Sequence, residues 1–133
     1  MLMKSFSLFV LFSLFIQVQA MAQVKGPMLE FKETYHDFGD IKQGEVVEYK
    51  FEFTNTGDST LLLQKVFSTC GCTIPTWPKE GIAPGKSEFI VVKYNSEGKM
   101  GLQNKIITLF SNAKNVAEDV PQRLSIRVNV VQK

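Results

Sequence analysis

The chain has 133 residues, of which 44% are hydrophobic and 21% are charged, a balance typical of one globular domain rather than of a disordered or collagen-like chain. This length is too short for a Rossmann dehydrogenase or a barrel enzyme. Fifteen basic residues stand against thirteen acidic ones, and this net charge of +2 gives no argument for a nucleic-acid partner.

The N-terminal residues have the pattern of an export signal. Lys4 supplies one positive charge, residues 6–16 contain only two polar side chains, and Ala20-Met21-Ala22 fits the small-x-small pattern that precedes a cleavage at Gln23. Eleven helical residues rise only about 16 Å, which is too short to cross the hydrocarbon core of a membrane. We therefore expect a signal peptide at residues 1–22 and a domain at residues 23–133 that has no membrane span after cleavage and is secreted or periplasmic.

Alternating apolar and polar residues predict half-buried β-strands in three parts of the chain. The alternating apolar residues are Val47, Tyr49, Phe51 and Phe53, then Ile90, Val92 and Tyr94, and finally Leu124, Ile126, Val128 and Val130. Residues 28–32, 61–67 and 102–110 are weaker candidates because their apolar residues fall on both faces. For the last two of these segments the register stays open, since a bulge and burial on both faces give the same pattern.

Turn residues separate these segments at short intervals. The predicted turns are Gly39-Asp40, Thr56-Gly57-Asp58, Ala83-Pro84-Gly85-Lys86 and Glu97-Gly98-Lys99. Residues 112–123 are polar and contain Pro121, which favours a loop with at most one helical turn at residues 116–119. No segment after residue 22 keeps a helical period.

Six or seven strands without a helix predict a sandwich or a small barrel, because only these arrangements bury the apolar faces. We expect an all-β, immunoglobulin-like antiparallel β-sandwich of about seven strands. It is not of the antibody type, since the two cysteines are only two positions apart. The predicted core consists of Tyr49, Phe51, Phe53, Leu63, Ile90, Val92, Ile126 and Val128.

Four segments together resemble a bacterial family, domain of unknown function 1573. They are Tyr35-His36-Asp37-Phe38-Gly39-Asp40-Ile41, Phe51-Glu52-Phe53-Thr54-Asn55-Thr56-Gly57, Cys70-Gly71-Cys72-Thr73 and Ile82-Ala83-Pro84-Gly85. The chain departs from the family pattern at Gly81, where a second proline often stands. The resemblance implies a secreted protein of the Bacteroidetes kind and a Hydin-like or major-sperm-protein-like sandwich of seven or eight strands. It implies a binding or scaffold role and carries no catalytic residues.

Cys70 and Cys72 are the most distinctive chemical feature of the sequence. Residues i and i+2 of a strand lie on one face about 6.6 Å apart, so a disulfide between them needs the bend that Gly71 allows. Three interpretations stay open: thiols or a local disulfide that cap a strand end and pack on Trp77, a copper or zinc site, and thiol redox chemistry. The metal interpretation lacks further ligands, because His36 is the only histidine.

Two other residues are weak candidates for function. His36 precedes Asp37, but neighbouring strand residues point to opposite faces and do not orient each other, so we expect His36 to be a surface or edge histidine. Trp77 lies in a proline-rich loop, where it either anchors a partner or packs over the end of the sandwich.

The sequence contains no motif of a known catalytic site, and we expect an exported, non-enzymatic binding or scaffold domain with no cofactor. Its partner would be a protein, reached through residues 46–55 or 124–131 if either strand lies at a sheet edge. The alternative is a small periplasmic metal or thiol-redox protein built around Cys70 and Cys72.

Overall fold

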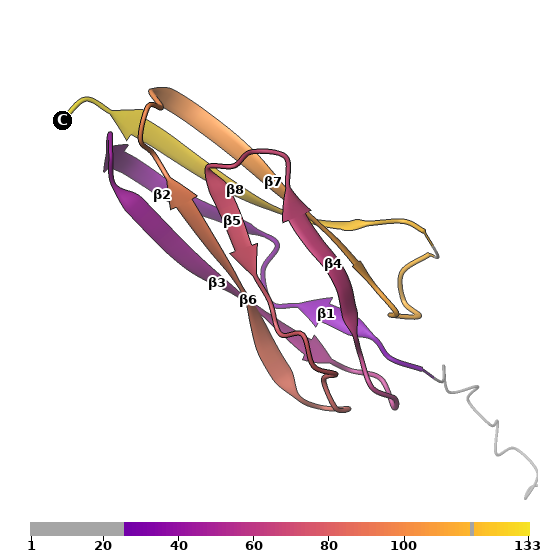
Figure 1. Ribbon diagram of the computed structural model, residues 1–133. Helices are drawn as coiled ribbons and strands as arrows, with labels where there is room; N and C mark the ends of the chain where they lie inside the picture. The colour runs from indigo at the N-terminus through magenta and orange to yellow at the C-terminus, as the bar shows by residue number, and fades with distance from the viewer. Residues whose placement is uncertain (1–25, 118) are drawn as a thin grey trace, which may run out of the picture.

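The computed structural model describes residues 26–117 and 119–133, so the predicted signal peptide and its cleavage site lie outside the described residues. The described chain contains eight strands and no helix (Figure 1). The strands are β1 (Leu29–Phe31), β2 (Tyr35–Lys42), β3 (Val46–Asn55), β4 (Leu63–Ser68), β5 (Thr73–Thr76), β6 (Ser87–Asn95), β7 (Gly101–Ser111) and β8 (Gln122–Val131). Consequently, none of the described residues belongs to a helix that could cross a membrane.

Two four-stranded sheets pack face to face, in the orders β1-β3-β6-β5 and β2-β8-β7-β4. All but one of the strand pairs are antiparallel. The exception is β2, which runs parallel to β8 from Tyr35 to Lys42. The expected immunoglobulin-like sandwich is confirmed, and one parallel pair departs from the wholly antiparallel arrangement that the alternation suggested.

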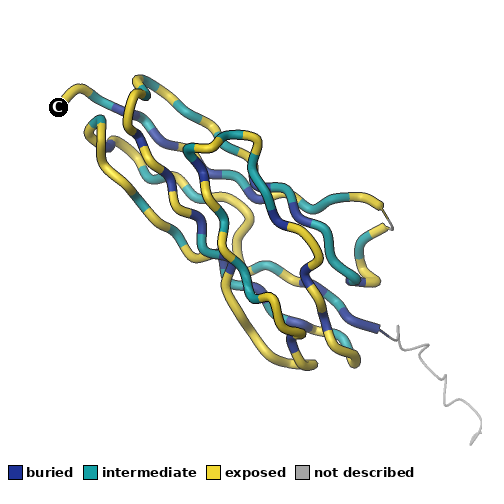
Figure 2. Tube along the Cα trace, in the orientation of Figure 1, coloured by how far each residue is buried: buried dark blue, intermediate teal, exposed yellow. Residues whose placement is uncertain are grey.

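The core fills the space between the sheets, and buried and exposed residues alternate along the strands (Figure 2). Seven of the eight predicted core residues are buried: Phe51, Phe53, Leu63, Ile90, Val92, Ile126 and Val128. Tyr49 is only half-buried at the rim of the core, because its hydroxyl reaches outward to Glu33. Phe51, the next inward residue of β3 after Tyr49, is fully buried.

Strands β2 and β5 were not among the strands that alternation predicted. Gly39 and Asp40 were expected to form a turn, but they lie inside β2, where the register with β8 shifts and Gly39 has φ +68°. β5 is four residues long and contains Pro75, a residue that argues against a central strand. It is an edge strand, which explains why it tolerates the proline.

The open registers have different explanations in the two segments. In β4 the register with β7 shifts between Leu63 and Lys65, so this segment contains a bulge. In β7, Ile107 and Leu109 are buried while Leu102 and Ile106 are each 52% exposed. The two-sided pattern of β7 therefore arises because its outward positions, Leu102 and Ile106, are apolar as well as its inward ones.

The long loop after β7 is irregular, as expected from its polar sequence. The Val120 N–H donates to the Ala117 carbonyl at 3.1 Å. The single helical turn considered at residues 116–119 includes residue 118, which lies outside the described residues. β8 lies between β2 and β7, so residues 124–131 offer no free sheet edge. β3 pairs with β1 at Phe53–Asn55, and the Lys32 N–H also donates to the Glu52 carbonyl. Among the described residues, the part of this edge before Glu52 pairs with no strand.

Candidate functional site

The turn between β4 and β5 contains the disulfide Cys70–Cys72, whose Cα atoms are 5.2 Å apart. The Thr73 N–H donates to the Cys70 carbonyl at 3.1 Å, which closes a four-residue turn around Gly71. This bend brings the cysteines closer than the roughly 6.6 Å of a flat strand. Both cysteines are half-buried and Gly71 is exposed.

The disulfide and Trp77 lie at opposite ends of β5. Cys72 directly precedes this strand and Trp77 directly follows it, a separation of about 16 Å along an extended chain. This separation gives no support to the expected packing of the cysteines on Trp77, which stays a prediction. Cys72 and Trp77 both pack against the core cluster.

Trp77 is half-buried, and the Lys79 Nζ lies 2.8 Å from the centre of its ring. Its indole Nε1 is buried without a hydrogen-bond partner among the described residues. The ring thus contacts the core on one side and carries a lysine over its face. A partner that uses Trp77 would have to displace Lys79, so recognition by this residue stays a prediction.

Metal binding was the second interpretation of the cysteine pair. In the described part of the chain, no group of three or more histidine, cysteine, aspartate or glutamate side chains is arranged to hold a metal ion. Both sulfurs are also engaged in the disulfide, whereas a thiolate is the form that binds metal. The geometry gives the metal interpretation no support.

His36 joins the two sheets rather than facing Asp37. Its ring stacks on that of Tyr49 at 3.6 Å and meets the edge of Phe38 at 4.6 Å. The Tyr49 hydroxyl donates to Glu33, and this hydrogen bond, with burial and the nearby carboxylate, raises the pKa of Tyr49. The rings of His36, Phe38 and Tyr49 therefore pack together between β2 and the open edge of β3.

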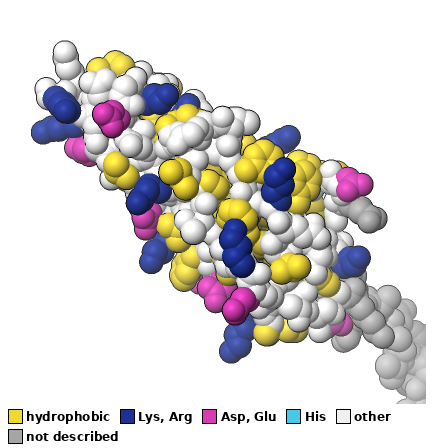
Figure 3. Space-filling view, viewed as in Figure 1, with side chains coloured by type: hydrophobic (Ala, Val, Ile, Leu, Met, Phe, Trp, Pro, Cys, Tyr) yellow, Lys and Arg dark blue, Asp and Glu magenta, His cyan; other side chains and the backbone are white. Residues whose placement is uncertain are grey.

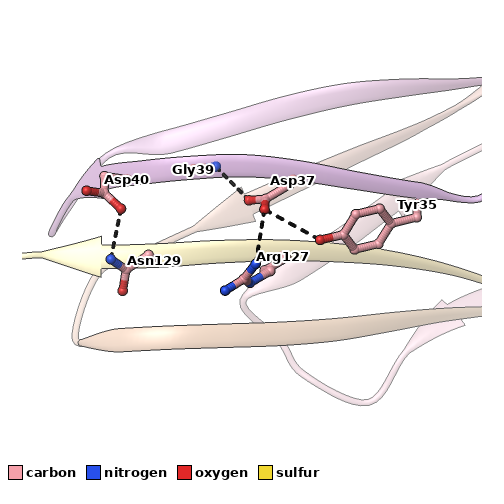
Figure 4. Close-up of polar contacts among 6 residues, drawn as sticks. All are labelled: Tyr35, Asp37, Gly39, Asp40, Arg127 and Asn129. Carbon is pink, nitrogen blue, oxygen red and sulfur yellow. Dashed lines mark hydrogen bonds and ion pairs between the residues drawn. The ribbon is translucent and has the colours of Figure 1, made fainter.

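Asp37 points to the other face of β2, where polar contacts hold β2 against β8 (Figure 4). It accepts from the Gly39 N–H at 2.8 Å and lies 3.4 Å from an Arg127 nitrogen, while Asn129 donates to Asp40 at 2.8 Å. The Arg127–Asp37 ion pair is exposed, so it adds little stability. Its role is to position the bulged strand, and its geometry is not that of a catalytic dyad.

The outward side of this sheet carries exposed apolar side chains, and we call it the β7–β8 face. It is formed by Tyr35, Asp37, Leu102, Asn104, Ile106, Ser125 and Arg127. Tyr35 and Ile106 both pair with Ser125 and are 50% and 52% exposed. Two strand spacings, about 10 Å, separate them. A signal for this face was present in residues 102–110, where apolar residues occupy both the inward and the outward positions of the strand.

Charged and apolar side chains are interspersed on the side of the molecule seen in Figure 3. A groove of about 650 Å³ lies between β4, the end of β7 and the β7–β8 connection. None of the residues predicted from the sequence as functional lines this groove. The predicted candidates His36, Cys70, Cys72 and Trp77 are half-buried and lie outside this groove.

Asn55 is a fully buried polar residue that the sequence analysis did not single out. Its side-chain oxygen accepts from the Gly57 and Met28 N–H groups, and its nitrogen donates to the Ser59 and Ile82 carbonyls. It therefore ties together the N-terminal strand, the β3–β4 connection and the loop before β6. This is a structural role, and it explains the polar residue at the end of an apolar row.

Comparisons with known proteins agree on the fold. The model of a family described as "Protein of unknown function (DUF1573)" matches residues 29–130. A protein of unknown function from Porphyromonas gingivalis W83 is similar in structure, with a TM-score of 0.67 and 19% identity over 85% of this chain and 51% of that one. This chain therefore spans about half the length of that protein.

Two further solved structures share the fold. The ASH/PapD-like domain 7 of human CEP192 has a TM-score of 0.66 and 11% identity over 87% of this chain and 94% of that one. The E. coli chaperone DraB has a TM-score of 0.51 and 16% identity over 82% and 57%. At these identities the likeness concerns the fold alone. No curated protein matches the sequence.

Proposed function

The chain belongs to the family of proteins of unknown function DUF1573, and from this premise we propose that it is an exported, non-enzymatic domain that binds a protein partner through the β7–β8 face. A binding or scaffold role fits the PapD-like fold that it shares with a chaperone and an ASH domain.

The observation that carries the proposal is the exposure of apolar side chains on a flat sheet face. Leu102 and Ile106 are each 52% exposed, although residues of this kind usually face the core. Arg127 of β8 pairs with Asn104, which lies midway between Leu102 and Ile106 on β7. Tyr35 pairs with Ser125 on the other side of β8. Tyrosine and arginine are enriched in protein interfaces, and an exposed sheet face suits a protein better than a small molecule, which binds in concave sites.

The charge of this sheet indicates the chemistry of the partner. Its outward positions carry four cations against two carboxylates; these are Lys42, Lys65, Arg123 and Arg127 against Asp37 and Asp40. A partner surface with apolar and acidic side chains is the complement of this pattern.

Export is supported by the half-exposed disulfide, because disulfides persist in oxidising compartments and are rare in the reducing cytosol. The signal-like pattern of residues 1–22 agrees with this. N-terminal sequencing of the protein from the producing cell tests export, and a start at Gln23 is the expected result.

Site-specific photo-crosslinking in the producing cell tests the binding face. A photoreactive amino acid at position 102 or 106 is expected to give one discrete crosslinked product, and Arg127→Glu is expected to weaken it. Ile74 is the matched control, since it is 56% exposed on the opposite sheet. Equal crosslinking from position 74, or none from 102 and 106, would overturn the choice of face.

A further inference from the structure

The disulfide turn between β4 and β5 is open to a second molecule. A Cβ placed on Gly71 would have no heavy atom within 4 Å apart from its chain neighbours. Gly71 itself is exposed and both flanking cysteines are half-buried. Exposed disulfides are the ones that exchange with external thiols, whereas structural disulfides are generally protected.

The fold does not depend on this disulfide to hold the turn. The Thr73 N–H bonds to the Cys70 carbonyl at 3.1 Å, and the Asn95 N–H bonds to the Cys72 carbonyl at 2.8 Å. β5 is further paired with β6 along its whole length. A disulfide that closes so short a loop constrains the unfolded chain very little. Reduction should therefore leave the two sulfurs close together in an intact turn.

The two sulfurs have different surroundings. Cys72 packs against the core cluster, and its Sγ lies 3.7 Å from the hydroxyl oxygen of the buried Thr73. Cys70 accepts a contact from the Cys72 N–H, whose nitrogen lies 3.2 Å from the Cys70 Sγ. A thiolate that accepts a hydrogen bond is stabilised, so each sulfur has a donor ready for its anionic form.

We propose that Cys70–Cys72 is an exchangeable disulfide that oxidises a pair of thiols in a partner protein, with Cys70 as the attacked sulfur and Cys72 as the leaving group. This exchange consumes the disulfide and is stoichiometric, so it is compatible with the non-enzymatic binding role proposed above. It goes beyond that role and uses a different part of the surface. It requires no cofactor, because the disulfide itself is the oxidant and the partner dithiol is the reductant.

The reaction has two steps. A thiolate of the partner attacks the Cys70 Sγ, the Cys70–Cys72 bond breaks, and its electron pair moves to the Cys72 Sγ, which accepts the Thr73 hydroxyl hydrogen bond. The second thiolate of the partner then attacks the partner's own sulfur in the mixed disulfide and expels the Cys70 thiolate. The partner loses two electrons and two protons and gains a disulfide, and the two cysteines end as thiols.

The test uses the purified oxidised protein and a reduced synthetic peptide with two cysteines. After quenching with acid and alkylation, mass spectrometry is expected to show peptide disulfide and doubly alkylated protein in equal amounts. The double variant Cys70→Ser plus Cys72→Ser is the control and should leave the peptide reduced. Resistance of the protein disulfide to a large excess of peptide would overturn the proposal.

Single variants test the assigned roles. With an aromatic disulfide reagent, the remaining Cys70 of Cys72→Ser should react about tenfold faster than the remaining Cys72 of Cys70→Ser, because Cys72 packs on the core. Thr73→Val should slow exchange several-fold and Thr73→Ser should restore it. The opposite order of reactivity would overturn the assignment of attacked and leaving sulfur.

A structural role makes a different prediction. If the bridge were a structural staple, the double variant would show a large fall in its denaturation midpoint, and such a fall would overturn the proposal. Crosslinking from position 106 is expected to persist in the double variant. Failure of the redox activity and failure of the binding proposal are thereby distinguishable.

Discussion

Replacing Asn55 with alanine should remove the contacts that hold three parts of the chain together. The side-chain nitrogen donates to Ser59 at 2.7 Å and to Ile82 at 2.9 Å, and the oxygen accepts from Gly57 at 3.0 Å and from Met28 at 3.3 Å. Asn55 is completely buried. Water would therefore not readily replace the lost partners.

Each hydrogen bond contributes about 0.5–1.5 kcal/mol net, and a buried group left without a partner costs about 1–3 kcal/mol. The Met28 contact is long, and the Ile82 carbonyl keeps a second donor, the Leu61 N–H at 2.9 Å. Three good bonds lost, with partial compensation, give an expected loss of about 3–5 kcal/mol for Asn55→Ala. That is a large share of the roughly 5–15 kcal/mol that stabilises a domain.

Urea denaturation followed by the fluorescence of Trp77, the single tryptophan, measures this loss. Asn104→Ala is the matched control, because Asn104 is exposed on β7 and should change the free energy of unfolding by less than about 0.5 kcal/mol. A loss below about 1 kcal/mol for Asn55→Ala, or one equal to the control, would refute the assignment of Asn55 as the residue that joins the three segments.

Three further predictions concern stability and are measured in the same way. Gly57→Ala should cost at least about 2 kcal/mol, because its Cβ would lie 2.0 Å from the Gly26 carbonyl oxygen; a loss under about 0.5 kcal/mol would contradict this close approach. Phe51→Ala should cost about 3–5 kcal/mol, and less than about 1 kcal/mol would place Phe51 outside the core. Tyr94→Phe should stabilise the fold by about 1 kcal/mol, since the buried hydroxyl has no partner among the described residues; a loss would reveal one. Burial also raises the pKa of Tyr94, so above about pH 10 the unfolded chain loses this proton before the native one does, and stability should fall with pH less steeply in Tyr94→Phe than in the parent.

Alternation predicted the strands that have one buried and one exposed face, and it missed two of the four edge strands, β2 and β5. β3, β6 and β8 each pair on both sides and keep a strict period of two. β2 contains a register shift that interrupts the period, and β5 is short and contains Pro75. The parallel pairing of β2 with β8 depends on where β1 ends and β2 crosses to the other sheet. Sequence periodicity holds no information on that crossing.

The buried polar residues had a signal that could have been read. Along β3 the inward positions are Val47, Tyr49, Phe51 and Phe53, and Asn55 continues the same phase. Ser96 likewise continues the inward row of Ile90, Val92 and Tyr94, and its hydroxyl contacts the Lys42 and Glu45 carbonyls. A polar residue in the apolar phase at a strand end is thus a candidate loop anchor. The partners of Asn55 lie 2, 4 and 27 residues away, and the distant ones could not have been predicted from periodicity.

The segments that carried the family resemblance divide into those the fold needs and one that it does not. Asn55 and Gly57 fix the N-terminal strand, Gly85 turns the chain at φ +77°, and Asp37 holds the bulge of β2. The Cys70-Gly71-Cys72 turn is different, because backbone hydrogen bonds already close it and anchor it to β6. A disulfide in a turn that backbone hydrogen bonds already close adds little to the stability of the fold, which leaves its exchange chemistry to be tested. For that reason the exchange experiment at Cys70 addresses function more directly than any substitution in the core.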